Sequence, residues 1–166
     1  MGGLVVSRDE FDSAALFNVM KLVGGVLGVW DAHEILRGLK TLAVRLDRQC
    51  ENAQTLAGFL KEHQGIGRVH YPGIGALVSI ELRDNTQAAA FQFMDRLKLI
   101  LRSTSLGDVF TSVLHPATAS HRDLIPARRN ELGIVDGLVR ISVGIESVDD
   151  IIADIEQALS TDYTDS

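Results

Sequence analysis

The sequence contains few of the residues that define several large classes of protein. Only one of its 166 residues, Cys50, is a cysteine, which excludes disulfide frameworks and multi-cysteine metal sites and fits a reducing compartment, here expected to be cytoplasmic. Basic residues number 16 against 22 acidic ones and form no cluster, which argues against a nucleic-acid partner. No apolar run approaches the roughly 20 residues of a membrane span, and no signal-peptide pattern opens the chain, so we expect a soluble protein.

The chain has enough apolar sequence to build a core, with hydrophobic residues making up 46% of it. Residues 1–30 hold an amphipathic helix and a glycine-rich joint, interpreted as the edge of a larger domain. From Asp31 to near Gly65 the apolar residues keep helical spacing, which predicts one long interdomain-type helix over 31–64. Residues 65–166 are predicted to form an α+β domain.

Within that domain, stretches with a period of two residues alternate with stretches of helical period. The pattern predicts a small antiparallel sheet covered by helices on one face. The expected elements are strands at 68–71, 78–82 and 137–146, an extended stretch at 99–105, a loop at 107–126, and helices at 85–97, 128–132 and 147–159.

The strand at 137–146 places one cation on the polar face of an otherwise apolar element. Its two faces should carry Val139, Ile141, Val143 and Ile145 on one side and Arg140, Ser142, Gly144 and Glu146 on the other. The planar fork of an arginine donates two parallel hydrogen bonds to a carboxylate, so Arg140 is a candidate anion-binding residue. A solvated or ion-paired surface arginine is the alternative that the spacing leaves open.

This strand and its following helix cap resemble the end of the Cys/Met-metabolism enzymes that use pyridoxal phosphate, such as cystathionine γ-synthase, cystathionine γ-lyase and methionine γ-lyase. Other segments resemble that family in the same order: RGLKTL at 37–42, YPG at 71–73, SLG at 105–107, and HPA at 115–117 with His121. The resemblance covers nearly the whole chain. It implies the C-terminal domain of a fold-type I enzyme of this class.

The resemblance also implies residue roles. Arg140 would bind the substrate α-carboxylate, and Ser105 would assist through its backbone or hydroxyl. The family's Schiff-base lysine, in an S-x-T-K segment, and its cofactor-holding groups have no counterpart, so no catalytic or cofactor-binding residue is expected here. Pyridoxal phosphate is the cofactor of the family but is not expected to be held covalently by this chain alone. The chain's own lysines are expected to be solvated: Lys21, Lys40, Lys61 and Lys98.

Three other groups of residues are interpreted as structural. The spacing of His115 and His121 fits no standard metal-ligand pattern, so no metal site is expected. Cys50 lies on the apolar stripe of the long helix and is expected to be a small buried side chain. Acidic residues gather where the last helix begins, as its dipole favours, and are expected to form a solvated face: Asp149, Asp150, Asp154 and Glu156.

Two functional hypotheses follow. In the first, the chain is the substrate-carboxylate domain of a transsulfuration-type enzyme, of the C–S lyase or γ-synthase class. It would be inactive alone, bind a sulfur-containing amino acid, and act with a lysine-bearing partner chain. The alternative is a non-catalytic truncated remnant or a protein-assembly module. The apolar faces of the first helix and the long helix favour a homo-oligomer. The identity of the amino acid, and the choice between elimination and replacement, stay open.

Overall fold

The computed structural model describes residues 3 and 5–160 and divides the chain into two compact units, residues 1–43 and 44–166. The first unit contains α1 (Glu10–Val23) and α2 (Val29–Leu39). The chain passes from α1 toward α2 through Gly24 and Gly25, whose φ angles of 84° and 77° lie in the left-handed region that favours glycine. None of the side chains described in this unit is buried, so these residues form no core among themselves.

The long helix predicted from Asp31 to near Gly65 is wrong as a single element. Helix α2 ends at Leu39, and α3 (Leu42–Glu62) begins after two turn residues. At the break, the backbone N–H and the hydroxyl of Thr41 both donate to the carbonyl of Gly38, at 3.4 Å each, and such local bonds compete with the helical ladder. The boundary between the two units falls near this break, and the expected limits at 30 and 64 stay predictions.

The second unit is built on a five-stranded sheet. Its strands lie in the order β1-β2-β5-β4-β3, and every pair is antiparallel except β3 with β4. Strand β4 lies inside the segment predicted to be a loop. The prediction missed it because a three-residue strand that is buried throughout shows no alternation of apolar and polar residues. The bounds are β1 (Ile66–His70), β2 (Leu77–Leu82), β3 (Leu101–Arg102), β4 (Ser112–Leu114) and β5 (Leu138–Ser142).

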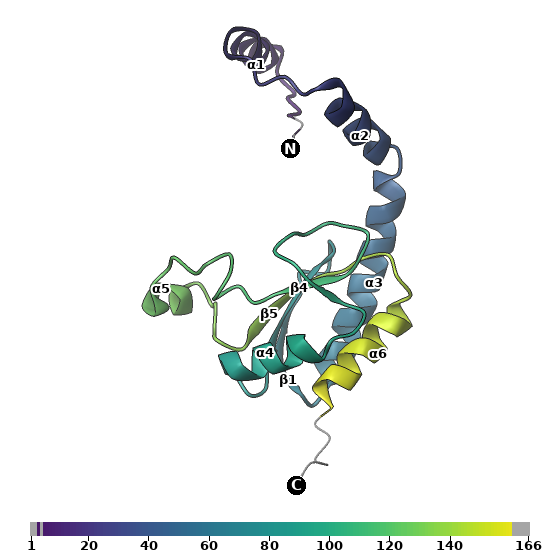
Figure 1. The fold of residues 1–166 in the computed structure, drawn as a ribbon, viewed down its shortest axis with the longest axis vertical. Coiled ribbons are helices and arrows are strands. Elements are labelled where there is room, and N and C mark those ends of the chain that lie inside the picture. Colours follow the sequence, from purple (N-terminus) through teal and green to yellow (C-terminus); the bar gives the residue numbers. More distant parts are fainter. Residues whose placement is uncertain (1–2, 4, 161–166) are drawn as a thin grey trace. The chain divides into compact units, whose positions relative to one another are not determined.

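Three helices pack against one face of this sheet: α3, α4 (Gln87–Arg96) and α6 (Val148–Leu159) (Figure 1). The helices and strands meet in one hydrophobic core, whose largest fully buried side chains include Leu56, Leu60, Ile80, Ile141, Ile151 and Ile155. The predicted α+β class, with helices over one sheet face, is confirmed. The remaining helix of this unit among the described residues, α5 (Pro126–Glu131), has no buried residue.

The alternation predicted for the Arg140 strand is confirmed up to the end of β5. Val139, Ile141 and Val143 are completely buried in the core. Ile145, expected on the same face, is instead 39% exposed, because the strand has ended and its backbone N–H donates to the carbonyl of Val109 at 2.9 Å. The core face of β5 is therefore fixed by burial, which leaves the opposite face for polar residues.

Helix α6 begins after Ser147 as predicted, but its acidic residues are not all solvated. Asp154 is buried, and its carboxylate accepts hydrogen bonds from the backbone N–H groups of Lys98, Leu99 and Ile100 at 2.8, 3.0 and 2.9 Å. It ties the chain entering β3 to α6. Of the helices that the structure describes, none is both long and apolar enough to cross a membrane.

Candidate functional site

Arg140 lies at the centre of the sheet. It is the middle residue of β5, and its register partners are Ser79 on β2 and Leu114 on β4. Its side chain is half-buried on the sheet face opposite the helices, and its buried Nε has no hydrogen-bond partner in the structure. One terminal nitrogen donates to the carbonyl of Thr104 over a long 3.4 Å. The guanidinium thus lies beside Thr104 while much of its hydrogen-bonding capacity is unused.

Ser105 follows directly after the residue that contacts Arg140. It is exposed, and its backbone N–H donates to Ser103 Oγ at 3.1 Å. The contact between Arg140 and Thr104 therefore places the 103–110 segment, which connects β3 to β4, beside the guanidinium. The two residues predicted from the sequence are 35 positions apart in the chain, and the structure brings Arg140 to the carbonyl of Thr104, the residue before Ser105.

Three further hydrogen bonds, at residues 107–109, attach the 103–110 segment to the rest of the second unit. Gly107 N–H donates to Ser142 Oγ at 2.9 Å, and Gln49 Nε2 donates to the carbonyl of Asp108 at 2.6 Å. The carbonyl of Val109 accepts the bond from Ile145 already described. Gln49 is almost completely buried on α3 and was missed from the sequence; its polar side chain within an apolar stripe was the available signal.

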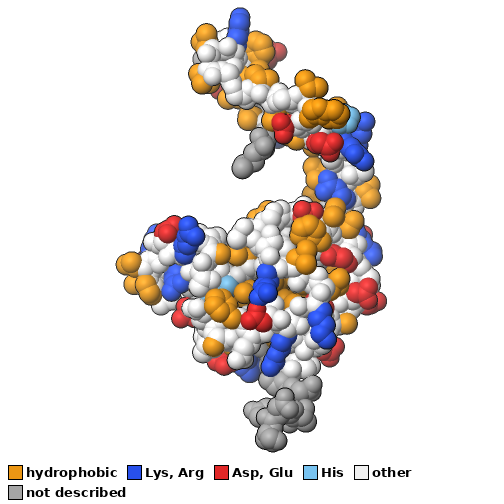
Figure 2. All heavy atoms as spheres, viewed as in Figure 1, with side chains coloured by type: hydrophobic (Ala, Val, Ile, Leu, Met, Phe, Trp, Pro, Cys, Tyr) orange, Lys and Arg blue, Asp and Glu red, His pale blue; other side chains and the backbone are white. Residues whose placement is uncertain are grey.

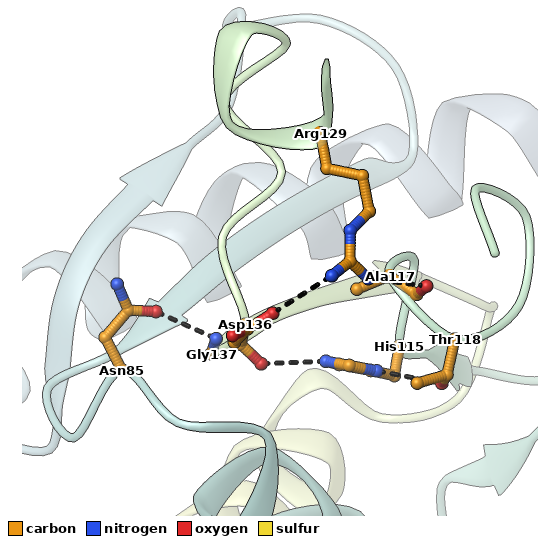
Figure 3. A network of polar contacts seen from close by, with 7 residues as sticks. All are labelled: Asn85, His115, Ala117, Thr118, Arg129, Asp136 and Gly137. Atoms are coloured by element: carbon orange, nitrogen blue, oxygen red, sulfur yellow. Dashed lines mark hydrogen bonds and ion pairs between the residues drawn. The ribbon is translucent and has the colours of Figure 1, made fainter. Parts of the chain in front are cut away.

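A second polar network holds the chain where it enters β5 (Figure 3). His115 is buried, its Nε2 lies 2.8 Å from the carbonyl of Asp136, and its Nδ1 lies 2.9 Å from Thr118 Oγ. Because a carbonyl oxygen only accepts, Nε2 carries the proton and Nδ1 accepts from the hydroxyl when the ring is neutral. Asn85 Oδ1 accepts from the next backbone N–H, that of Gly137, at 2.8 Å. The start of β5 is therefore fixed on two sides.

Arg129 connects the same network to α5 (Figure 3). It donates to the carbonyl of Ala117 at 2.9 Å and forms an ion pair with Asp136 at 3.6 Å. His121, the second histidine of the HPA segment, is engaged with Ser120 at 2.8 Å. Both His115 and His121 therefore have a hydrogen-bonding partner within the structure.

Cys50 is half-buried rather than fully buried and is a free thiol. Tyr71, in the YPG turn, donates its hydroxyl to the carbonyl of Gly75 at 3.1 Å. Burial first, and the nearby Cys50 second, raise the pKa of the Tyr71 phenol above its ordinary value. The phenol is therefore neutral at physiological pH and keeps its proton for this hydrogen bond.

The α+β fold defines the class: its structural neighbours are fold-type I pyridoxal-phosphate enzymes. The chain belongs to the Cys/Met metabolism PLP-dependent enzyme family, whose model matches residues 1–160. The resemblance drawn from short motifs is thereby confirmed over nearly the whole sequence.

Individual relatives show how much of the family fold is present. L-methionine gamma-lyase of Fusobacterium nucleatum is 40% identical over 176 aligned positions, which cover 96% of this chain and 44% of that protein. Cystathionine beta-lyase of Bacillus subtilis is 38% identical over 175 positions, covering 96% and 44%. The solved structure of a cystathionine gamma lyase from Micromonospora echinospora superposes with a TM-score of 0.86 at 34% identity, covering 93% of this chain and 44% of that one. The chain thus spans less than half the length of these relatives.

The residues of this chain do not fit pyridoxal phosphate as a covalently held group. A lysine that forms an imine needs a depressed pKa, which burial or a neighbouring cation supplies. All the lysines of the sequence are exposed: Lys21, Lys40, Lys61 and Lys98. What the described residues offer instead is an arginine on a strand paired on both sides, which suits an anion.

Proposed function

We propose that this chain is the substrate-carboxylate side of a PLP-dependent enzyme of Cys/Met metabolism, of the C–S lyase or γ-synthase class. Arg140 binds the α-carboxylate of a sulfur-containing amino acid, and Ser105 assists from the adjacent segment. The observation that carries the proposal is the guanidinium of Arg140 on the central strand, which lies beside the 103–110 segment with one long bond of 3.4 Å to the carbonyl of Thr104. The carboxylate would be bound by the terminal N–H groups of this guanidinium, through charge-assisted hydrogen bonds.

The position of Arg140 on the sheet supports this role. Strand β5 has a paired strand on each side, so the backbone of Arg140 is held by two ladders. The fixed backbone defines where the guanidinium can reach, and its planar fork loses less rotamer entropy per hydrogen bond and orients the carboxylate. An amino acid held this way presents its amino group and side chain in a defined direction.

We further propose that the reaction needs a lysine-bearing region of the family fold in addition to these 166 residues. All the lysines of the chain are exposed, which supports assigning imine formation to that other region. The chain alone should therefore form no imine at a defined lysine. The test is visible absorbance after pyridoxal phosphate is added, followed by borohydride reduction and mapping of any modified lysine. Modification concentrated at one lysine would contradict the proposal.

The carboxylate role is tested by calorimetric titration of the full chain with L-methionine. Charge-assisted hydrogen bonds contribute about 1.5–3 kcal/mol, so Arg140→Ala should weaken binding by about 10- to 150-fold. Arg128→Ala is the matched control, because Arg128 is an exposed arginine whose ion pair with Glu131 lies on α5. L-methionine methyl ester, which lacks the carboxylate, should bind the wild-type chain weakly. Equal affinity of wild type and Arg140→Ala would refute the role.

A second candidate function, an assembly module, is favoured by the surface of the first unit. Hydrophobic side chains are exposed along α1 and α2 (Figure 2), including Phe17, Leu22, Val29 and Trp30. Exposed apolar surface of this kind marks protein contacts. We propose that a second copy of the chain covers it, as in a homo-oligomer.

Trp30 makes this testable, because it is the only tryptophan of the sequence and is 80% exposed. Sedimentation velocity over a range of concentrations should show self-association, and the fluorescence of Trp30 should shift to shorter wavelength as the assembly forms. A monomer at all concentrations, with a constant water-exposed emission, would exclude self-association through this surface.

A further inference from the structure

Thr111 directly follows the 103–110 segment and is completely buried. Its backbone N–H donates to Glu146 Oε1 at 2.5 Å, and its hydroxyl donates to Glu146 Oε2 at 2.9 Å. The same hydroxyl oxygen accepts from Gly144 N–H at 2.9 Å. Both carboxylate oxygens of Glu146 thus grip one buried residue, 35 positions earlier in the chain.

Glu146 is itself held from α3. The side-chain amide of Asn52, which is only 2% exposed, donates to the carbonyls of Glu146 and Gly144 at 2.8 and 3.0 Å. A buried amide that donates to two neighbouring carbonyls fixes the chain between them. The carboxylate of Glu146 therefore starts from a defined backbone position.

Close backbone packing adds to this grip. A Cβ added at Gly144 would lie 2.6 Å from the carbonyl carbon of Phe110 and would also overlap Val109 and Glu146. Only glycine allows the segment to come so near to the end of β5. At its other end, the segment is attached through Gly107 to Ser142. Thr104 and Ser105 lie beyond this attachment, and the carbonyl of Thr104 accepts the bond from Arg140.

We infer that Glu146 and Thr111 form a clasp that sets the 103–110 segment over Arg140, which makes Glu146 a positioning residue for carboxylate binding. The inference rests on the proposed function and adds to it a group that does not touch the substrate. A segment that is already ordered in the free protein loses little conformational entropy when the ligand binds. Releasing the clasp should therefore weaken binding while Arg140 stays intact.

The test compares three variants of the full chain. Thr111→Val removes the hydroxyl at nearly constant volume, Glu146→Gln removes the charge at constant size, and Thr111→Ser keeps the hydroxyl as the rescue. Affinity for L-methionine is measured by titration, and backbone hydrogen exchange is measured at Gly107 and Ile145, whose N–H groups hold the segment. The amide of Ile141, in the core strand β5, serves as the internal control for unfolding.

We expect Thr111→Val and Glu146→Gln to bind about five- to tenfold more weakly and to exchange faster at Gly107, with unchanged protection at Ile141. Thr111→Ser should restore both readouts. If Thr111→Val does not fold, the result for Glu146→Gln decides the test, because Glu146 is only half-buried and its replacement disturbs the fold less.

The inference is overturned, and the proposed function stands, if both clasp variants bind like wild type while Arg140→Ala loses binding. It is also overturned if binding weakens without faster exchange at Gly107. Absence of binding to the wild type, or equal binding by Arg140→Ala, instead refutes the proposed function and the inference with it.

Discussion

Asp154 offers the sharpest test of how the second unit is held together. One buried carboxylate accepts three consecutive backbone N–H bonds from the residues that lead into β3. Replacing it by alanine removes both acceptor oxygens, and with them all three of these bonds, and preserves the helical preference of α6, because alanine is the best helix former.

The magnitude follows from where the three donors lie. The N–H of Ile100 is buried, and leaving such a group without a partner costs about 1–3 kcal/mol. The N–H groups of Lys98 and Leu99 are in partly buried bonds, so water can replace part of what they lose. We therefore expect Asp154→Ala to lower the free energy of unfolding by about 2–4 kcal/mol.

Urea denaturation followed by circular dichroism measures this difference. Glu156→Ala is the matched control, since Glu156 is an exposed acid two residues further along the same helix and should change stability by no more than about 0.5 kcal/mol. Asp154→Asn should recover only part of the loss, because its NH₂ group cannot accept. If Asp154→Ala were as stable as the Glu156→Ala control, the carboxylate would not be holding the chain and the argument would fail.

Other predictions concern the remaining networks. His115→Phe leaves the carbonyl of Asp136 without its donor and should cost about 1–3 kcal/mol in urea denaturation; a change under about 0.5 kcal/mol would show that the network does not stabilise the fold. Gly144→Ala places a methyl group against backbone and should cost about 1–3 kcal/mol, and an unchanged melting temperature would contradict that packing. The pKa of Tyr71 is raised in the folded state, so its contribution to stability is complete below the unfolded value of about 10 and is lost as the pH rises through the folded pKa. Stability should fall more steeply above about pH 10 in wild type than in Tyr71→Phe, and identical pH profiles would refute this.

Much of the fold could be predicted because periodicity reports burial directly. The alternation along β5 identified the face that packs against the helices and the opposite face that carries Arg140. Periodicity did not predict the structure correctly where a short element or a local hydrogen bond determines it. Strand β4 is too short to alternate, and the break before α3 depends on bonds between Thr41 and Gly38 that apolar spacing does not register.

The candidate site was only partly accessible from the sequence. Arg140 and Ser105 were identified because short motifs resemble a family, and the structure places them near each other. The groups that hold them in place could not be found the same way. Thr111 and Glu146, or Asp154 and Ile100, are separated by 35 and 54 positions, and no residue pattern says which side chains meet across such distances.

The central claim, that Arg140 binds the substrate carboxylate, is tested most directly by the NMR signal of its Nε–H group during titration with L-methionine. The signal is assigned by its loss in Arg140→Lys. The account predicts a saturable shift of this resonance and of the Ser105 amide, with a much smaller effect from the methyl ester. A resonance that does not move, or that moves equally with the ester, would contradict it.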